Sequence, residues 1–172
     1  MFEELLFQRV KKLIALCAAH HIGITTIESC TGGLLSALLT STPGSSSVIH
    51  SNIVTYHNDA KIRYVGVDPQ TLRAYGAVSE ETAREMALGG VQALTPFEAF
   101  SHIISLSITG VAGPDGGTKD KPVGTVCFGC AVGDMVHSTT YHFDGFRDQV
   151  RMHAVRQAIR LIEQEIKKIE QS

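Results

Sequence analysis

Apolar residues recur along the chain in two patterns, and these patterns predict helices that alternate with strands. Apolar steps of three and four residues, with capping residues at their ends, predict helices over about 3–20, 34–39, 59–65, 80–94 and 146–169, and a small one beginning at Asp68-Pro69. Short runs rich in β-branched residues predict strands over about 22–27, 48–56, 103–109, 123–132 and 136–143. Gly133-Asp134 joins the last two strands, which indicates an antiparallel hairpin.

This order of elements predicts an α/β fold. Because one hairpin interrupts the alternation, we expect a three-layer α/β/α sandwich whose mixed sheet is mostly parallel and contains one antiparallel strand. A chain of 172 residues suits a single domain over 1–172. In such folds ligands collect at the carboxyl ends of strands, so the turns after the first three strands are expected to share one cleft.

Composition narrows the class of protein. A hydrophobic content of 44% indicates a compact globular chain, and a net charge of −2 gives no basic field for nucleic acid or an anionic membrane. No stretch approaches the length of a membrane span, and Met1-Phe2-Glu3-Glu4 lacks the blocks of a signal peptide. We therefore expect a cytoplasmic protein that binds neither nucleic acid nor membrane.

The cysteines and histidines do not predict a metal site. The four cysteines are expected to be reduced thiols in the cytoplasm. Cys127 and Cys130 have C-x-x-C spacing, but they fall in a predicted strand, where residues three apart point to opposite faces. The eight histidines are scattered without an H-x-x-x-H pair. We expect no bound metal and no cofactor.

The first candidate site is the strand-to-helix turn Glu28-Ser29-Cys30-Thr31-Gly32-Gly33. The first amides of a helix lack intrahelical partners and the helix dipole adds positive potential, so a hydroxyl here faces an anion site. Ser29 is the candidate nucleophile. The alternative is that Ser29 or Thr31 only caps the helix and that the glycines only allow close packing.

A second candidate follows the strand at 48–56. Tyr56 ends this strand, Asn58 is expected to cap the next helix, and Lys61 falls in its first turn. A lysine near the positive end of a helix and shielded from water has a lowered pKa, which suits a base. The alternative is that Tyr56 packs in the core and Lys61 lies on the surface.

Two further segments are candidates for ligand binding. The glycine-rich loop over 110–122 follows a strand and can bring backbone amides close to a ligand, or it is simply mobile. It matches neither the P-loop nor the dinucleotide fingerprint. Arg147 and Arg151 oppose the dipole at the start of the last helix, which favours either binding of a phosphate or carboxylate or a salt bridge to a nearby acid.

Several of these segments together resemble one known family, the C-terminal domain of the competence/damage-inducible protein CinA. The motifs that carry the resemblance span nearly the whole chain, and the most specific are the glycine-rich turn and a Tyr-x-Asn-x-x-Lys segment. They are Glu28-Ser-Cys-Thr-Gly-Gly33, Pro43-Gly-Ser, Val54-Thr-Tyr-His-Asn-Asp-Ala-Lys61, Gly76-Ala-Val-Ser-Glu80, Thr109-Gly-Val-Ala-Gly-Pro114, Lys121-Pro-Val-Gly-Thr125 and Phe143-Asp-Gly-Phe-Arg147.

The resemblance implies a nicotinamide-nucleotide amidase, which hydrolyses the carboxamide of nicotinamide mononucleotide to nicotinate mononucleotide and ammonia. It implies that Ser29, Tyr56 and Lys61 are catalytic, with Lys61 acting on Ser29 directly or through Tyr56, and that amides around Thr31 to Gly33 stabilise the oxyanion. The residues expected to bind substrate are Cys30, Thr31, Gly32, Gly33, Asn58, Thr109, Gly110, Gly113 and Arg147.

Other family features are also implied. Members are expected to form homodimers or larger homo-oligomers. Many carry a larger N-terminal domain, and the pyrophosphatase activity associated with it is not expected of this chain. Phe146 stands where the family usually has an acid, which leaves any role of that acid open, although Arg147 is kept.

Two other assignments remain open at this point. Cys30 could be the nucleophile with His57 as its base. The domain could also be a catalytically silent module that binds a nucleotide or a protein in a competence or damage response.

Overall fold

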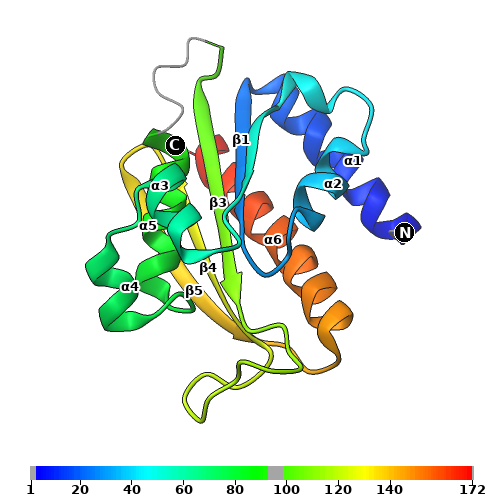
Figure 1. Ribbon diagram of the computed structural model, residues 1–172. Coiled ribbons are helices and arrows are strands. Elements are labelled where there is room, and N and C mark those ends of the chain that lie inside the picture. Colours follow the sequence, from blue (N-terminus) through cyan, green and yellow to red (C-terminus); the bar gives the residue numbers. More distant parts are fainter. Residues whose placement is uncertain (1–2, 93–98, 172) are drawn as a thin grey trace.

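The computed structural model describes residues 3–92 and 99–171, which form a five-stranded sheet between two layers of helices (Figure 1). The strands are β1 (Ile22–Glu28), β2 (Ile49–Val54), β3 (His102–Gly110), β4 (Thr125–Val132) and β5 (Met135–His142), in the spatial order β2-β1-β3-β4-β5. β1 pairs in parallel with β2 and β3, whereas β4 is antiparallel to both of its neighbours. β4 is therefore the one strand of opposite direction, which confirms the predicted sheet.

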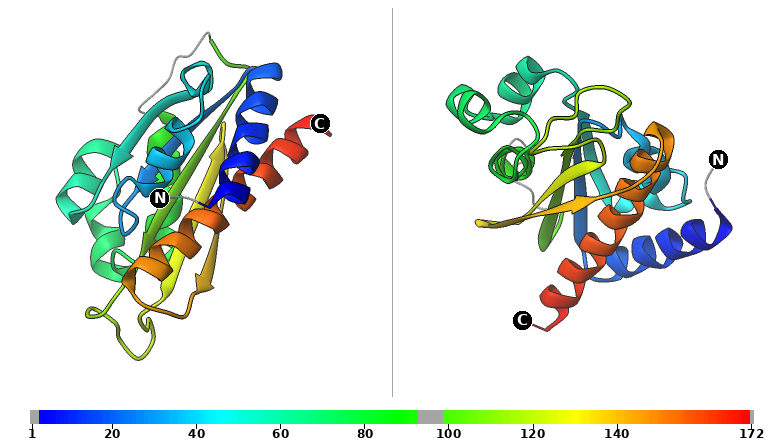
Figure 2. Two further views of the ribbon diagram at one scale, coloured as in Figure 1. Left: turned by 90° about the vertical axis from the view of Figure 1, so that its right-hand side faces the viewer. Right: turned by 90° about the horizontal axis from the view of Figure 1, so that it is seen from below.

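Helices cover both faces of this sheet. They are α1 (Glu4–Ala19), α2 (Leu34–Thr40), α3 (Asn58–Val65), α4 (Pro69–Tyr75), α5 (Glu80–Gln92) and α6 (Arg147–Glu170), with a 3-10 turn η1 (Ser45–Ser47). α1, α2 and α6 lie together on one face, and α3, α4 and α5 lie on the other (Figure 1). Figure 2 shows the sheet between α1 and α6 on one side and α3 to α5 on the other. The predicted three-layer α/β/α sandwich is confirmed.

The two faces of the sheet are packed differently. Aliphatic side chains of β1, β3 and β4 form the main core with α1, α2 and α6. On the other face α5 approaches the sheet closely because small residues face it: a Cβ on Gly129 would lie 2.1 Å from the Ala83 carbonyl oxygen. The same oxygen accepts a hydrogen bond of 2.6 Å from the Ser107 hydroxyl.

Most predicted ends agree with the structure, and the differences have local causes. Gly66 ends α3, Gly76 ends α4, and Ser79 caps α5 by accepting from the Thr82 N–H. The cap of α3 is His57 rather than Asn58, because the His57 Nδ1 accepts from the Asp59 N–H. The expected end of α5 near residue 94 lies outside the described residues.

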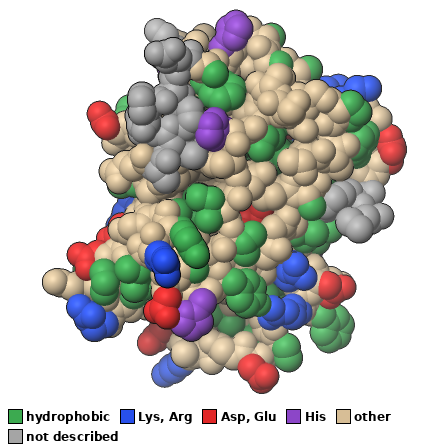
Figure 3. All heavy atoms as spheres, turned by 45° about the horizontal axis from the view of Figure 1, so that its top comes forward, with side chains coloured by type: hydrophobic (Ala, Val, Ile, Leu, Met, Phe, Trp, Pro, Cys, Tyr) green, Lys and Arg blue, Asp and Glu red, His purple; other side chains and the backbone are tan. Residues whose placement is uncertain are grey.

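The surface carries charges of both signs. On the face drawn in Figure 3, the basic side chains of the described residues lie beside acidic ones and form no continuous basic surface. Within 3–92 and 99–171, none of the helices has both the length and the apolar character needed to cross a bilayer.

Candidate active site

Ser29 is fixed at the carboxyl end of β1, in the middle of the sheet. Its N–H donates a hydrogen bond of 2.9 Å to the carbonyl oxygen of Ile108 in β3, and only 8% of the residue is exposed. The carboxyl ends of β1 and β3 lie at the lower side of the sheet in Figure 1. The polar turn after β1 therefore starts from a rigid and buried position.

Glu28 holds the start of α2. Its carboxylate is fully buried and accepts hydrogen bonds from the N–H groups of Gly33, Leu35 and Ser36, at 3.0, 3.1 and 2.8 Å. The Ser36 hydroxyl donates to the same carboxylate. A carboxylate at a helix N-terminus satisfies orphan donors and interacts favourably with the helix dipole. The anion at this helix end is thus one of the protein's own side chains.

This arrangement moves the expected oxyanion site. The Gly33 N–H is bonded to Glu28 and the Gly32 N–H to the carbonyl oxygen of Ser29, so neither is free for a ligand. The N–H groups of Cys30 and Thr31 make no hydrogen bond with another described residue. The N–H groups of Gly32 and Gly33 therefore hold the turn together. The N–H groups that remain available to a ligand are those of Cys30 and Thr31.

Lys61 reaches the nucleophile candidate from α3. Its Nζ lies 3.1 Å from the Ser29 Oγ and donates to the carbonyl oxygens of Thr55 at 2.8 Å and Tyr56 at 3.4 Å. The residue is only 1% exposed. The alternative that Lys61 lies on the surface is therefore wrong, because these three oxygens hold its amine in the interior.

Burial of Lys61 changes its chemistry. Removal from water disfavours the ammonium form and lowers the pKa of Lys61 below its ordinary value of 10.5, and only an ionised Cys30 thiolate nearby would oppose this effect. In the described structure no carboxylate forms an ion pair with it. A neutral amine 3.1 Å from a hydroxyl is placed to accept its proton.

Tyr56 lies at the mouth of the site, not between Lys61 and Ser29. The residue is 58% exposed, and its hydroxyl accepts a hydrogen bond of 2.7 Å from an amino nitrogen of Arg147. The other amino nitrogen of Arg147 donates to the carbonyl oxygen of Gly113 at 2.7 Å. Arg147, at the start of α6, therefore links the turn after β2 to the glycine-rich loop.

A cavity of about 230 Å³ opens over Ser29 and Lys61. Most of the residues predicted for the site line it, namely Ser29, Cys30, Tyr56, Asn58, Lys61, Thr109, Gly110 and Arg147. The predicted residues Thr31, Gly32, Gly33 and Gly113 are not part of its wall. Ala77, Val78 and Ala112 complete the wall; they are uncharged, and their types alone carried no chemical signal.

A second cavity adjoins the first, and its wall contains two arginines and one acid, Asp148. It has a volume of about 560 Å³ and shares Ala112 and Arg147 with the smaller one. Gly113, Phe146 and Arg151 also line it. Arg151 donates to the carbonyl oxygen of Thr31 at 2.8 Å, and neither arginine pairs with an acid among the described residues. Of the two alternatives for these arginines, the salt bridge is therefore not formed among the described residues.

The arrangement of Cys30 does not suit a nucleophilic thiolate. Burial raises the pKa of Cys30 to about 12, so the thiol stays protonated near neutral pH. His57 is exposed and uses its Nδ1 to accept from Asp59, and it makes no hydrogen bond with Cys30. Within the described residues, Ser29 is the hydroxyl or thiol that has a base beside it in this cavity.

Comparisons with known proteins agree with this fold. The family described as the CinA C-terminal domain matches residues 7–166. A putative competence-damage inducible protein of Clostridium novyi is 45% identical over 147 residues, which cover 86% of this chain and 34% of that protein. A CinA-like protein of Chlorobaculum tepidum is 50% identical over 119 residues, covering 69% of this chain and 27% of that protein. The chain thus spans about a third of the length of these curated relatives.

Solved structures give the same result. The crystal structure of the competence/damage inducible protein CihA from Agrobacterium tumefaciens has a TM-score of 0.86 and 34% identity, over 94% of this chain and 96% of that one. A CinA superfamily protein from Escherichia coli has a TM-score of 0.85 and 31% identity, over 95% of this chain and 93% of that one. The predicted resemblance is confirmed, and the chain belongs to the CinA C-terminal domain family.

Proposed function

We propose that this domain is a nicotinamide-nucleotide amidase, which hydrolyses nicotinamide mononucleotide to nicotinate mononucleotide and ammonia. One observation carries the proposal: the buried Lys61 amine, with its lowered pKa, lies 3.1 Å from the Ser29 hydroxyl at the base of a cavity. A serine hydroxyl is a weak nucleophile until a base removes its proton, and this pair supplies both groups. The family membership supports the choice of substrate.

The reaction follows from the two groups. Neutral Lys61 accepts the Ser29 proton while the Ser29 Oγ attacks the carboxamide carbon, which forms a tetrahedral oxyanion. The N–H groups of Cys30 and Thr31 are the proposed oxyanion donors, and loss of one such donor typically costs about 3–4 kcal/mol. The C–N bond then breaks, and Lys61 returns its proton to the departing ammonia. Lys61 next takes a proton from water while the water oxygen attacks the acyl carbon. The bond between that carbon and the Ser29 Oγ then breaks, Lys61 returns the proton to the Oγ, and nicotinate mononucleotide leaves.

The two cavities divide the substrate between them. We place the pyridine ring and its carboxamide in the 230 Å³ cavity over Ser29, and the ribose phosphate in the adjoining 560 Å³ cavity. Arg147 and Arg151 line the larger space and carry charges that are not paired with acids of the described chain, so they suit a phosphate. The pyridinium charge draws electrons from the carboxamide and assists attack on it.

In this proposal Tyr56 has a different role from the one first expected. Its hydroxyl contacts Arg147 and not the Ser29–Lys61 pair, so we assign it to orienting the arginine and covering the ring. Lys61 acts directly on Ser29.

A panel of three amides tests the function. Ammonia release is measured with nicotinamide mononucleotide, nicotinamide riboside and free nicotinamide at equal concentrations. We expect the mononucleotide to have the highest kcat/KM, since only it offers a phosphate to the two arginines. If the wild-type protein binds the mononucleotide but releases no ammonia from any of the three, the domain is a silent binding module.

A further inference from the structure

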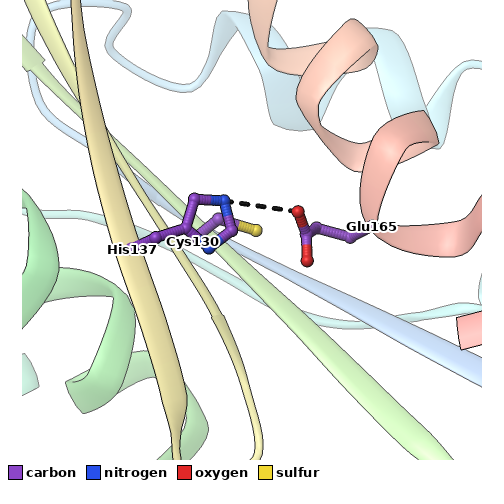
Figure 4. Close-up of side chains that lie close together, drawn as sticks. All are labelled: Cys130, His137 and Glu165. Atoms are coloured by element: carbon purple, nitrogen blue, oxygen red, sulfur yellow. Dashed lines mark ion pairs between the residues drawn. The ribbon is translucent and has the colours of Figure 1, made fainter. Parts of the chain in front are cut away.

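Three potential metal ligands converge away from the candidate active site. They are the thiol of Cys130 in β4, the imidazole of His137 in β5 and the carboxylate of Glu165 in α6. One ligand atom from each lies within 4.8 Å of the other two, and the side chains point toward one another (Figure 4). None of the three lines the cavity over Ser29.

The convergence follows from the register of the sheet. Cys130 and His137 are directly opposite each other in the antiparallel pair β4–β5, so their side chains lie on the same face. Cys127, three residues earlier in β4, points to the other face, where it contacts Thr140. α6 covers the Cys130 face and places Glu165 over the pair. Three rigid elements thus each contribute one ligand.

Glu165 is a charged residue in an apolar position. It is 7% exposed and lies on the same buried stripe of α6 as Ile162 and Ile166. Its Oε1 lies 3.3 Å from the His137 Nε2 and accepts from Lys168 at 2.6 Å. No described residue donates a hydrogen bond to its Oε2 or to the Cys130 thiol. A buried carboxylate needs cationic or hydrogen-bonding partners. Both partners of Glu165 contact its Oε1, so its Oε2 can still bind a cation.

We propose that Cys130, His137 and Glu165 form a binding site for Zn²⁺ or a similar divalent transition metal. These donor types bind zinc at about 2.3 Å for sulfur, 2.0–2.1 Å for nitrogen and 2.0–2.2 Å for oxygen. In a tetrahedron of that size, nitrogen and oxygen lie about 3.4 Å apart, close to the 3.3 Å between His137 and Glu165. The sulfur must come to about 3.6 Å from the other two, which a rotation of side chains can supply.

Lys168 competes with the metal for Glu165. Its side chain is 63% exposed, so it can move into water when a divalent cation takes the carboxylate. The His137 side chain is 45% exposed and gives the metal a route from solvent, with water as the fourth ligand. A bound metal would hold the second half of α6 against the β4–β5 hairpin.

Sequence spacing predicted no metal site, because these ligands come from residues that are distant along the chain and form no motif. The site is also independent of the proposed amidase activity, since no residue is shared with the cavity over Ser29. A chelator is therefore expected to lower thermal stability and leave amidase activity unchanged.

Titration of the full chain with Co²⁺, followed by displacement with Zn²⁺, tests the proposal. The wild type should develop a sulfur-to-cobalt charge-transfer band and the strong visible bands of a tetrahedral site. Cys130→Ser should remove the charge-transfer band, and His137→Gln and Glu165→Gln should weaken binding by about 100-fold or more, beyond the loss known for outer-shell partners. Cys127→Ser and His142→Gln change the same residue types on the same strands and should bind normally.

Lys168→Met supplies a test that removes no ligand. Because it removes a competing cation whose own side chain is exposed, it should tighten Co²⁺ binding by about two- to fivefold. If Cys130→Ser fails to fold, the variants at His137 and Glu165 decide the matter. Absence of the charge-transfer band in the wild type, or unchanged binding in both His137→Gln and Glu165→Gln, would overturn the proposal.

Discussion

Replacement of Lys61 by methionine should lower activity and remove a pH-dependent contribution to stability. Met keeps an apolar stem of similar length but removes the amine that contacts Ser29. A general base typically contributes about 10² to 10⁴-fold to rate, and each tenfold corresponds to about 1.4 kcal/mol of barrier. We therefore expect kcat/KM for nicotinamide mononucleotide to fall by about 3–5 kcal/mol of transition-state stabilisation.

The pH dependence of the wild-type rate follows from the same group. Only neutral Lys61 is a base, and burial lowers its pKa below 10.5. The kcat/KM should therefore rise as pH increases through this lowered pKa, and should level off at a lower pH than it would with a lysine of ordinary pKa. The residual rate of the Lys61→Met variant should not show this rise with pH.

Stability gives an independent measure of the same pKa. Between the lowered pKa of the folded state and 10.5, the unfolded chain binds more protons at Lys61 than the folded chain, so wild-type stability increases with pH there. The slope reaches at most about 1.4 kcal/mol per pH unit. Below the lowered pKa the amine is protonated in both states, and the cost of burying its charge becomes constant.

Urea unfolding of wild type and Lys61→Met at several pH values measures this slope. The free energy of unfolding of the wild type, relative to the variant, should decrease as pH is lowered from 10.5 and then level off. Lys11→Met removes the same charge from an exposed position and controls for net charge. A difference that stays constant with pH, together with near-normal activity of Lys61→Met, would refute the assignment of Lys61 as a buried base.

Three further substitutions test the parts that surround the pair. Glu28→Ala should lower the free energy of unfolding by about 3 kcal/mol, because three N–H groups at the start of α2 lose a charged acceptor, and urea unfolding measures this loss. Arg147→Ala should raise KM for nicotinamide mononucleotide by about 10- to 100-fold, the equivalent of one charge-assisted hydrogen bond. The rate for free nicotinamide should change little. An equal loss for both amides would contradict phosphate binding by Arg147. Tyr56→Phe should reduce kcat/KM by less than about tenfold, because the Tyr56 hydroxyl contacts Arg147 rather than Lys61. A loss as large as that of Lys61→Met would instead indicate that Tyr56 relays the proton.

The order and type of the elements were predictable because the apolar pattern and the turn residues agreed locally. Gly66, Gly76 and Ser79 end or begin helices as expected, since each acts through its own backbone or a near neighbour. Predictions were less exact where two residues compete for one position. His57 rather than Asn58 caps α3, because its ring nitrogen reaches the Asp59 N–H.

The candidate site was predictable in outline but not in its internal hydrogen bonds. Ser29, Tyr56 and Lys61 follow strands whose carboxyl ends meet, so a shared cleft was expected. The use of Glu28 as the internal anion of α2 was not predicted, because strand position alone does not say where a buried carboxylate turns. The partners of Arg147 and Arg151 were not predicted either, because they are backbone carbonyl oxygens that are distant in sequence.

The convergence of Cys130, His137 and Glu165 shows another limit of sequence patterns. The prediction that Cys127 and Cys130 point to opposite faces of β4 is confirmed, because Cys127 contacts Thr140 on the face away from Cys130. The residues that do lie near Cys130 are set by the register of β4 with β5 and by the packing of α6. Both depend on the completed fold.

Ammonia release from nicotinamide mononucleotide by Ser29→Ala and Cys30→Ala, measured beside the wild type, tests the central claim most directly. We predict that Ser29→Ala loses at least about 10⁴-fold in kcat, as is usual when a hydrolase loses its nucleophile, and that Cys30→Ala remains active with or without a chelator. Full activity of Ser29→Ala together with an inactive Cys30→Ala would contradict the assignment of Ser29 as the nucleophile.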